Sequence, residues 1–213
     1  MKINIQYLLI LILLISGLQT IGQRNADELL KQVIDKTRSY ENLKVDFTYS
    51  MVNEKAGINE EKKGSLFLKD NAYKITFDAQ IVLSDGKTVW TYLEESNEVM
   101  ISDVEEGEDV MTPNSLLTSY YTDYKASFFH DKNNDIKGLK TIELKPSVGK
   151  KFTKIQLGIS ESKLQLINLS VFDNGGNTFV YDLSKMTPNV VLAKDFFQFD
   201  QKKYPGVDIV DMR

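Results

Sequence analysis

The sequence contains no cysteine among its 213 residues. The chain can therefore form no disulfide and no thiolate metal site, and no lipid can be attached to a cysteine behind a leader, so the protein is not itself a lipoprotein. A chain of this length buries enough surface to fold without crosslinks. The lack of cysteine favours a bacterial periplasm over an animal secretory route, in which small domains rely on disulfides.

Histidine is almost as scarce, since His130 is the only one. It stands beside two phenylalanines at the end of an apparent strand, which is typical of a structural or exposed histidine. The sequence has no Gly-x-Ser-x-Gly elbow, phosphate loop or dinucleotide fingerprint. Carboxylates are plentiful, but their spacing singles out no catalytic pair. We predict a non-enzymatic protein with no catalytic residues, no metal site and no cofactor.

The chain also lacks an excess of positive charge. Its formal net charge is -4, and no lysine-rich patch is interleaved with aromatic residues. Such a surface repels a phosphate backbone, so the partners are expected to include no nucleic acid. No Pro/Gly/Ser-rich linker divides the sequence and no repeat is visible, which favours a single domain, expected to act as a monomer.

The N-terminus has the three-part layout of a secretory leader: Lys2, an apolar run from Tyr7 to Ile15, and a polar stretch ending at Gly22. The run is shorter than the roughly 20 residues of a spanning helix. We predict a cleaved leader over residues 1–22 and one mature domain over 23–213. An uncleaved membrane anchor is the alternative.

A first amphipathic helix is predicted from about Ala26 to Ser39. Asn25 and Glu28 match a capping box, and the residues behind them repeat at helical spacing on one face: Leu29, Leu30, Val33 and Ile34. A second helix is predicted behind Thr112-Pro113, where the apolar positions are Leu116, Leu117, Tyr120, Tyr121 and Tyr124. The acidic segment over 103–109 matches no calcium loop and is expected to be solvated.

Most of the remaining chain alternates between apolar and polar residues, as strands with one buried face do. The clearest runs start at Leu43, Tyr73, Val99, Ile142, Ile155 and Phe179. Asp85-Gly86 supplies a tight hairpin turn, so consecutive strands are expected to be neighbours. The fold class is therefore mainly β (α+β), with a long antiparallel meander. A large sheet with two covering helices leaves room for an apolar concavity, which is how many ligand sites are built.

Three stretches resemble the LolA family of periplasmic carriers, which take lipoproteins from the inner to the outer membrane. They are the hairpin segment Leu83-Ser84-Asp85-Gly86-Lys87-Thr88-Val89-Trp90 with Tyr92, then Thr112-Pro113 with Leu116 and Leu117, and the ending from Phe196 to Asp208. The resemblance implies an incomplete antiparallel β-barrel with helices closing its concave face as a lid. Lipoprotein acyl chains would lie inside, in the periplasm of a Gram-negative bacterium.

The resemblance also implies site residues and partners. The expected lipid-binding residues are Phe47, Tyr49, Leu66, Leu68, Tyr73, Ile75, Phe77, Trp90 and Tyr92. The expected lid residues are Leu30, Val33, Leu116, Leu117, Tyr120 and Tyr121. The implied partners are an inner-membrane lipoprotein-releasing ABC transporter and an outer-membrane acceptor. The alternatives are a carrier of other lipids or pigment precursors, and a sensor of envelope stress that reads mislocalised lipoproteins.

The sequence departs from the family at one position of interest. Members often place Arg-Pro after the second strand, and that arginine helps to hold the lid shut. Here the segment reads Lys69-Asp70-Asn71-Ala72. A lysine supplies a point charge without the planar fork of donors that arginine has, so closure by an arginine is not expected in this chain.

Overall fold

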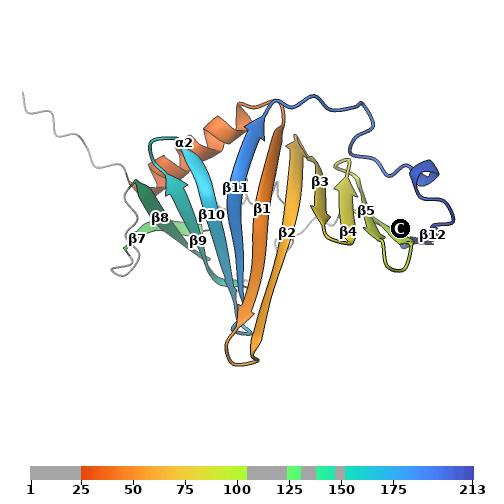
Figure 1. Cartoon of the computed structure of the whole chain (residues 1–213). Coiled ribbons are helices and arrows are strands. Elements are labelled where there is room, and N and C mark those ends of the chain that lie inside the picture. Colours follow the sequence, from red (N-terminus) through yellow and green to blue (C-terminus); the bar gives the residue numbers. More distant parts are fainter. Residues whose placement is uncertain (1–24, 105–123, 131–137, 147–151) are drawn as a thin grey trace, which may run out of the picture.

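The computed structural model describes residues 25–104, 124–130, 138–146 and 152–213. Its described part is one curled sheet with a single α-helix, α2 (Ala26–Arg38), and a short 3-10 helix, η1 (Gln201–Lys203) (Figure 1). The strands are β1 (Leu43–Asn53), β2 (Ile58–Lys69), β3 (Ala72–Phe77), β4 (Gln80–Ser84), β5 (Thr88–Leu93), β6 (Glu98–Asp103), β7 (Tyr124–Phe129), β8 (Leu139–Pro146), β9 (Phe152–Ser160), β10 (Gln165–Asp173), β11 (Thr178–Pro188) and β12 (Asp208–Asp211).

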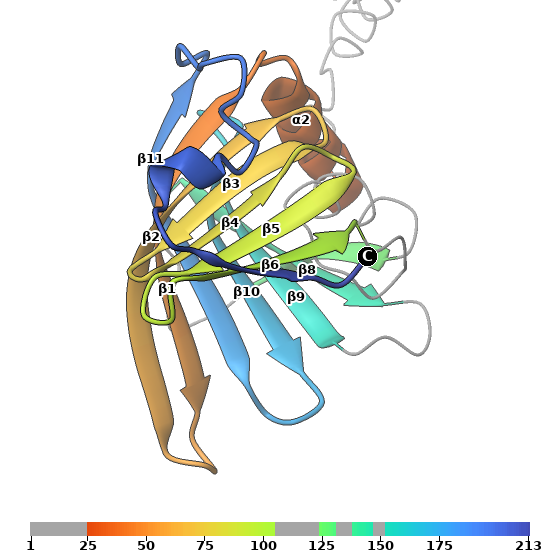
Figure 2. The same ribbon diagram turned by 90° about the vertical axis from the view of Figure 1, so that its right-hand side faces the viewer.

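The strands follow the order β12-β6-β5-β4-β3-β2-β1-β11-β10-β9-β8-β7. Neighbours are antiparallel except for β12, which pairs parallel with β6. The sheet curls without closing, so β12 and β7 remain its two ends, and α2 lies on the concave side (Figure 2). This architecture confirms the predicted incomplete barrel. It departs from a pure meander in two places, because β1 pairs with β11, which is distant in sequence, and β12 pairs parallel with β6.

Helix α2 forms where the capping box predicted it. The Asn25 side chain accepts a hydrogen bond from the Glu28 backbone N–H at 2.7 Å, which satisfies one of the free donors of the first turn. Acidic residues occupy the first turn and basic residues the last, which suits the helix dipole. The helix ends at Arg38, one residue before the predicted end.

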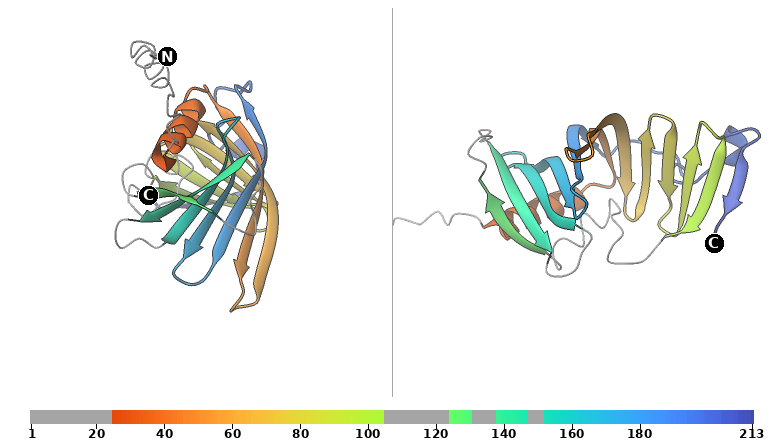
Figure 3. Two further views of the ribbon diagram at one scale, coloured as in Figure 1. Left: turned by 90° about the vertical axis from the view of Figure 1, so that its left-hand side faces the viewer. Right: turned by 90° about the horizontal axis from the view of Figure 1, so that it is seen from below.

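The main core lies between α2 and the concave face of β7 to β10. Leu29 of the helix is fully buried, as are Ile142, Leu144 and Ile155 of the strands. Figure 3 shows the helix lying across this half of the sheet and leaving the half formed by β1 to β6 uncovered by it. Within the described ranges, the molecule therefore has one half with a filled core and one half with an open concave face.

A C-terminal segment, which we call the strap (residues 189–207), crosses the outer face of the sheet and delivers β12 to the edge beside β6. The Phe196 ring packs on Phe67 with centroids 4.8 Å apart, and Tyr204 packs on Tyr92 at 4.3 Å. The strap thus forms a second, smaller core on the outer face.

Several predictions fall outside the described residues. They are the leader over 1–22, the acidic loop from 105 onward, and the second helix with Leu116, Leu117, Tyr120 and Tyr121. Tyr124, which helical spacing had added to that helix, instead begins β7. Within the ranges that the structure describes, no helix is long and apolar enough to span a bilayer.

Candidate functional site

The pairing register defines which side chains share the open concave face. Val45 of β1 lies opposite Leu66 of β2, and Leu66 lies opposite Ile75 of β3. The row continues through β4, β5 and β6 with Val82, Thr91 and Met100. Because paired residues project to the same side of a sheet, this row is a continuous and largely apolar band.

Aromatic rings gather beside this band. Phe47 and Phe77 are 5.5 Å apart in an edge-to-face arrangement, and Tyr49 and Tyr181 are 5.2 Å apart. Phe47 also contacts Tyr181 at 5.9 Å, which links β1, β3 and β11 into one cluster. Such pairs add about 0.5–1.5 kcal/mol beyond their burial. The cluster therefore forms an aromatic floor on the concave face beside the band.

Gly64 leaves the space that the Phe47 ring occupies in this cluster. It faces Phe47 across β1 and β2, and a methyl group built at Gly64 would come within 2.6 Å of the Phe47 Cζ atom. Only a residue without a side chain fits under the ring, so the glycine is required by close approach.

Most of this face is half-buried, in contrast to the core under α2. Leu66, Leu68, Ile75 and Phe77 are all of intermediate exposure. A recess of about 750 Å³ opens at the end of the face where Asp78 and Glu95 lie, within the range of small-molecule sites. A smaller recess of about 380 Å³ lies at the other end, between the end of α2 and the β2–β3 turn, with Lys69 in its wall.

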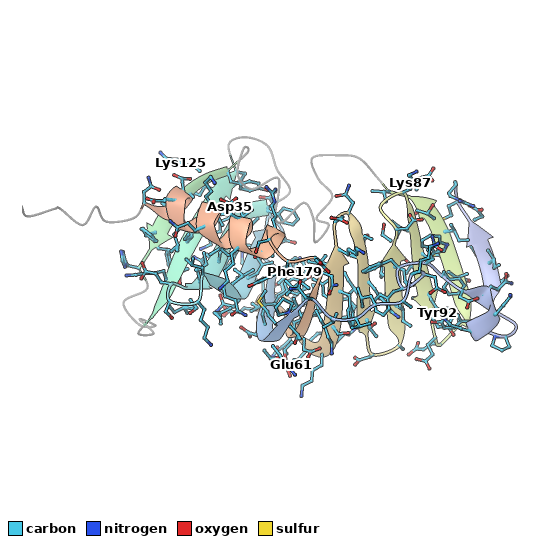
Figure 4. All side chains as sticks on the ribbon, turned by 90° about the horizontal axis from the view of Figure 1, so that it is seen from above. Asp35, Glu61, Lys87, Tyr92, Lys125 and Phe179 are labelled. Carbon is cyan, nitrogen blue, oxygen red and sulfur yellow. The ribbon has the colours of Figure 1, made fainter. Side chains whose placement is uncertain are left out.

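The structure brings together seven of the nine predicted lipid-binding residues on the concave face: Phe47, Tyr49, Leu66, Leu68, Tyr73, Ile75 and Phe77. The prediction that Trp90 and Tyr92 share this face is wrong. Tyr92 pairs with Ile81 and Val99, and both aromatic residues lie on the outer face, packed with Phe199 and Tyr204 of the strap. Figure 4 shows Tyr92 beside the C-terminal segment, far along the sheet from Phe179.

Sequence reasoning left out several residues of the concave face: Val82, Thr91, Leu93, Met100 and Tyr181. Tyr181 was detectable, because the alternation from Phe179 to Leu183 predicts the strand that carries it. Of the predicted lid residues, Leu30 and Val33 are buried against β7 to β10. The other four lie outside the described residues.

The described lining of the concave face is mainly apolar and aromatic. His130 is exposed behind β7. In the part of the chain that the structure describes, no three histidine or carboxylate side chains are grouped closely enough to hold a metal ion.

Burial of the aromatic cluster changes the acidity of its phenols. Burial raises the pKa of Tyr181 to about 12, with a smaller contribution from Tyr49. The pKa of Tyr49 is also raised, mainly by burial and then by the charge of Glu60. Both phenols are therefore neutral hydrogen-bond donors at physiological pH.

The raised pKa predicts a loss of stability in alkali. The unfolded phenol ionises near pH 10, whereas Tyr181 in the folded protein ionises near pH 12. Its contribution is complete below pH 10 and is lost as the pH rises toward 12, because only the unfolded state releases the proton in that window. Urea unfolding across this window should show the decline, and Tyr181→Phe should make it shallower. An unchanged slope in the variant would contradict the assignment.

Comparison with known proteins places this geometry in a family. The family model described as outer membrane lipoprotein carrier protein LolA matches residues 38–200. The chain belongs to the LolA family. An outer-membrane lipoprotein carrier protein from Coxiella burnetii (strain RSA 331 / Henzerling II) is 23% identical over 212 residues, covering 98% of this chain and 97% of that protein. One from Xylella fastidiosa (strain Temecula1) is 27% identical over 188 residues, with 83% and 85% covered.

The fold also occurs among solved structures. An uncharacterized conserved protein from Thermus thermophilus superimposes with a TM-score of 0.54 at 12% identity, covering 87% of this chain and 98% of that one. This likeness supports the fold alone. The family match confirms the resemblance inferred from the hairpin and the C-terminal ending, and it gives this LolA-family chain a general role in lipoprotein transport.

Proposed function

We propose that this protein carries lipoproteins through the periplasm of a Gram-negative bacterium by holding their acyl chains against the concave face of β1 to β6. The observation that supports the proposal most directly is the continuous apolar band from Val45 to Met100, which α2 leaves open. Membership of a family named for carrying outer-membrane lipoproteins points to the same ligand.

The proposed route has two partners. An inner-membrane ABC transporter would load the protein, and an outer-membrane acceptor would take the cargo from it. The carrier would work as a monomer, and its two edge strands, β12 and β7, would lie outside the binding face.

The leader over 1–22 would direct export, and the mature chain would begin at or near Gln23. The intact mass of the exported protein tests this cleavage, and a mass that retains residues 7–15 would exclude it.

Release of the cargo sets a limit on how tightly this face can bind. Each buried methylene contributes about 0.8 kcal/mol, so one chain of roughly 16 carbons would contribute about 13 kcal/mol. Two chains would exceed the practical ceiling of about 18 to 21 kcal/mol. We infer that cargo displaces apolar contacts present in the empty protein. Among the described elements, helix α2 is the candidate, because Leu30 and Val33 are buried on the half of the sheet that adjoins the open band. Acyl chains that extend past β1 would meet these contacts.

A charge placed on the apolar band tests the proposal. Ile75→Glu is expected to abolish capture of a diacylated lipopeptide, because an ionised carboxylate in the middle of the band cannot be buried under acyl chains. Binding is measured by displacement of a fluorescent fatty-acyl probe and by lipoprotein transfer from spheroplasts to the purified protein.

The matched control is Thr48→Glu. Thr48 lies on the outer face of β1, between Lys63 of β2 and Asp182 of β11, so the new carboxylate has one neighbour of each charge. This variant should bind as the wild type does. Thermal unfolding of both variants verifies folding. Full binding by a folded Ile75→Glu protein would show that the acyl chains lie elsewhere.

A further inference from the structure

The recess of about 750 Å³ differs in chemistry from the apolar band that leads to it. Its walls come from Tyr49 and Tyr181 on the central strands and from Phe77 at the end of β3. Its rim is formed by the β3–β4 and β5–β6 turns, which bring Asp78 and Glu95 to the same end of the sheet. We call it the turn-end recess.

Two tyrosine side chains meet in this recess, and neither hydroxyl makes a hydrogen bond to another described residue. Tyr49 and Tyr181 are direct cross-strand partners with ring centroids 5.2 Å apart. Among the described residues, no hydrogen bond to either hydroxyl is found, although every fully buried polar side-chain atom there has a partner. A tyrosine in a partly dry setting normally finds a partner for its O–H. These two donors are therefore available to a ligand.

The charged groups around the phenols select the kind of ligand. Lys62 lies opposite Tyr49 on the concave face, and it is the only cation among the described residues that line the recess. Asp78 and Glu95 supply two carboxylates, so the lining carries a net charge of -1, obtained as +1 from the lysine and -2 from the carboxylates. This balance opposes an anionic group, whereas a neutral hydrogen-bond acceptor is accommodated.

We propose that the turn-end recess is a head-group subsite that receives the ester carbonyls linking acyl chains to their glyceryl unit, with Tyr49 and Tyr181 donating to them. The inference rests on the proposed function, because it requires acyl chains on the adjoining apolar band. An ester carbonyl is neutral and accepts a hydrogen bond well. An ether oxygen is a poorer acceptor, and a free carboxylate is repelled by the rim.

The position of the recess fits this role. Phe77 contacts Tyr49 at 6.1 Å and Phe47 at 5.5 Å, so the aromatic cluster continues from the recess into the band. A ligand with its linkage between the phenols would direct its chains along β1 to β3 toward Leu66 and Val45. Its polar remainder would leave past the turns into solvent.

The test compares two synthetic lipopeptides that differ only in having ester-linked or ether-linked hydrocarbon chains. Each is titrated into the wild type and into the double variant Tyr49→Phe/Tyr181→Phe, which keeps both rings. We expect the double variant to bind the ester lipopeptide more weakly by about five-fold for each phenol lost. Its affinity for the ether lipopeptide should be unchanged. Palmitate should compete less well than the ester lipopeptide for the wild type.

The control variant is Tyr92→Phe, which removes a phenol from the outer face, where its hydroxyl bonds to the Asn97 side chain at 3.1 Å. It should bind both lipopeptides as the wild type does. Equal weakening of both lipopeptides by the double variant, or no weakening, would overturn the subsite while leaving the carrier function standing. A wild type that binds neither lipopeptide would overturn both.

Discussion

Replacing Leu29 with alanine is expected to lower the free energy of unfolding by about 2 to 5 kcal/mol. Leu29 is fully buried, and it sits in the core between α2 and β7 to β10 with Ile142, Leu144 and Ile155. The strands beneath are held by their own ladders and cannot close the gap, so a cavity should remain. The loss of unfolding free energy should then include both the lost burial of the leucine side chain and the cost of the cavity.

Urea unfolding followed by circular dichroism measures this change. Asp35→Ala is the matched control on the same helix, because it removes only an exposed ion pair with Lys31. That pair is worth about 0.3–0.5 kcal/mol. A cost for Leu29→Ala no larger than for the control would mean that α2 is not held on the sheet in solution. The helix would then be unable to act as a closed lid.

Local patterns were sufficient to predict helix α2 and half of the described strands. The capping box and the spacing from Leu29 to Ile34 specify α2 almost to its last residue, because the apolar face must meet a core. Alternation likewise predicts β1, β3, β6, β8, β9 and β11. The apolar positions of β1 and β3 also predict that Phe47, Tyr49 and Ile75 point to the same side of the sheet. The pairing register of β1, β2 and β3 confirms this.

The face of β5 could not be predicted from its own sequence. Its residues Thr88–Leu93 carry apolar side chains at both sets of alternate positions, with Val89 and Leu93 on one face and Trp90 and Tyr92 on the other. Which set turns inward depends on pairing with β4 and on the strap, which covers the outer face from far along the chain. The periodicity of β5 reveals neither the pairing nor the strap. The prediction therefore places Trp90 and Tyr92 on the concave face, whereas they lie on the outer face.

A bulge in β11 shows a second limit of periodicity. The register between β1 and β11 shifts at Asp46/Phe47, so that Phe47 lies opposite Leu183 and Val45 lies opposite Met186. The extra residue places Leu183 and Met186, three positions apart, on the same face. Strict alternation predicts opposite faces for them. Bulges of this kind are set by tertiary pairing and leave no reliable local signal.

Gly64→Ala is expected to destabilise the fold by about 1–3 kcal/mol despite adding only one methyl group. The new Cβ would lie 2.6 Å from Phe47 Cζ and 2.8 Å from the Thr76 backbone oxygen. The ring can tilt away, but only toward the open concave face, where it would take space from the ligand. Lipopeptide affinity should therefore fall together with stability.

A double-mutant cycle separates the two contacts. In a Phe47→Leu background the shorter side chain leaves room for the methyl group, so the cost of Gly64→Ala should shrink. It should not vanish, because the Thr76 oxygen belongs to the backbone of β3 and cannot be removed by substitution. Chemical denaturation of the four proteins gives the coupling directly. An equal cost of Gly64→Ala in both backgrounds would show that the Phe47 ring does not rest on Gly64. The close approach of these two residues would then not determine the shape of the binding face.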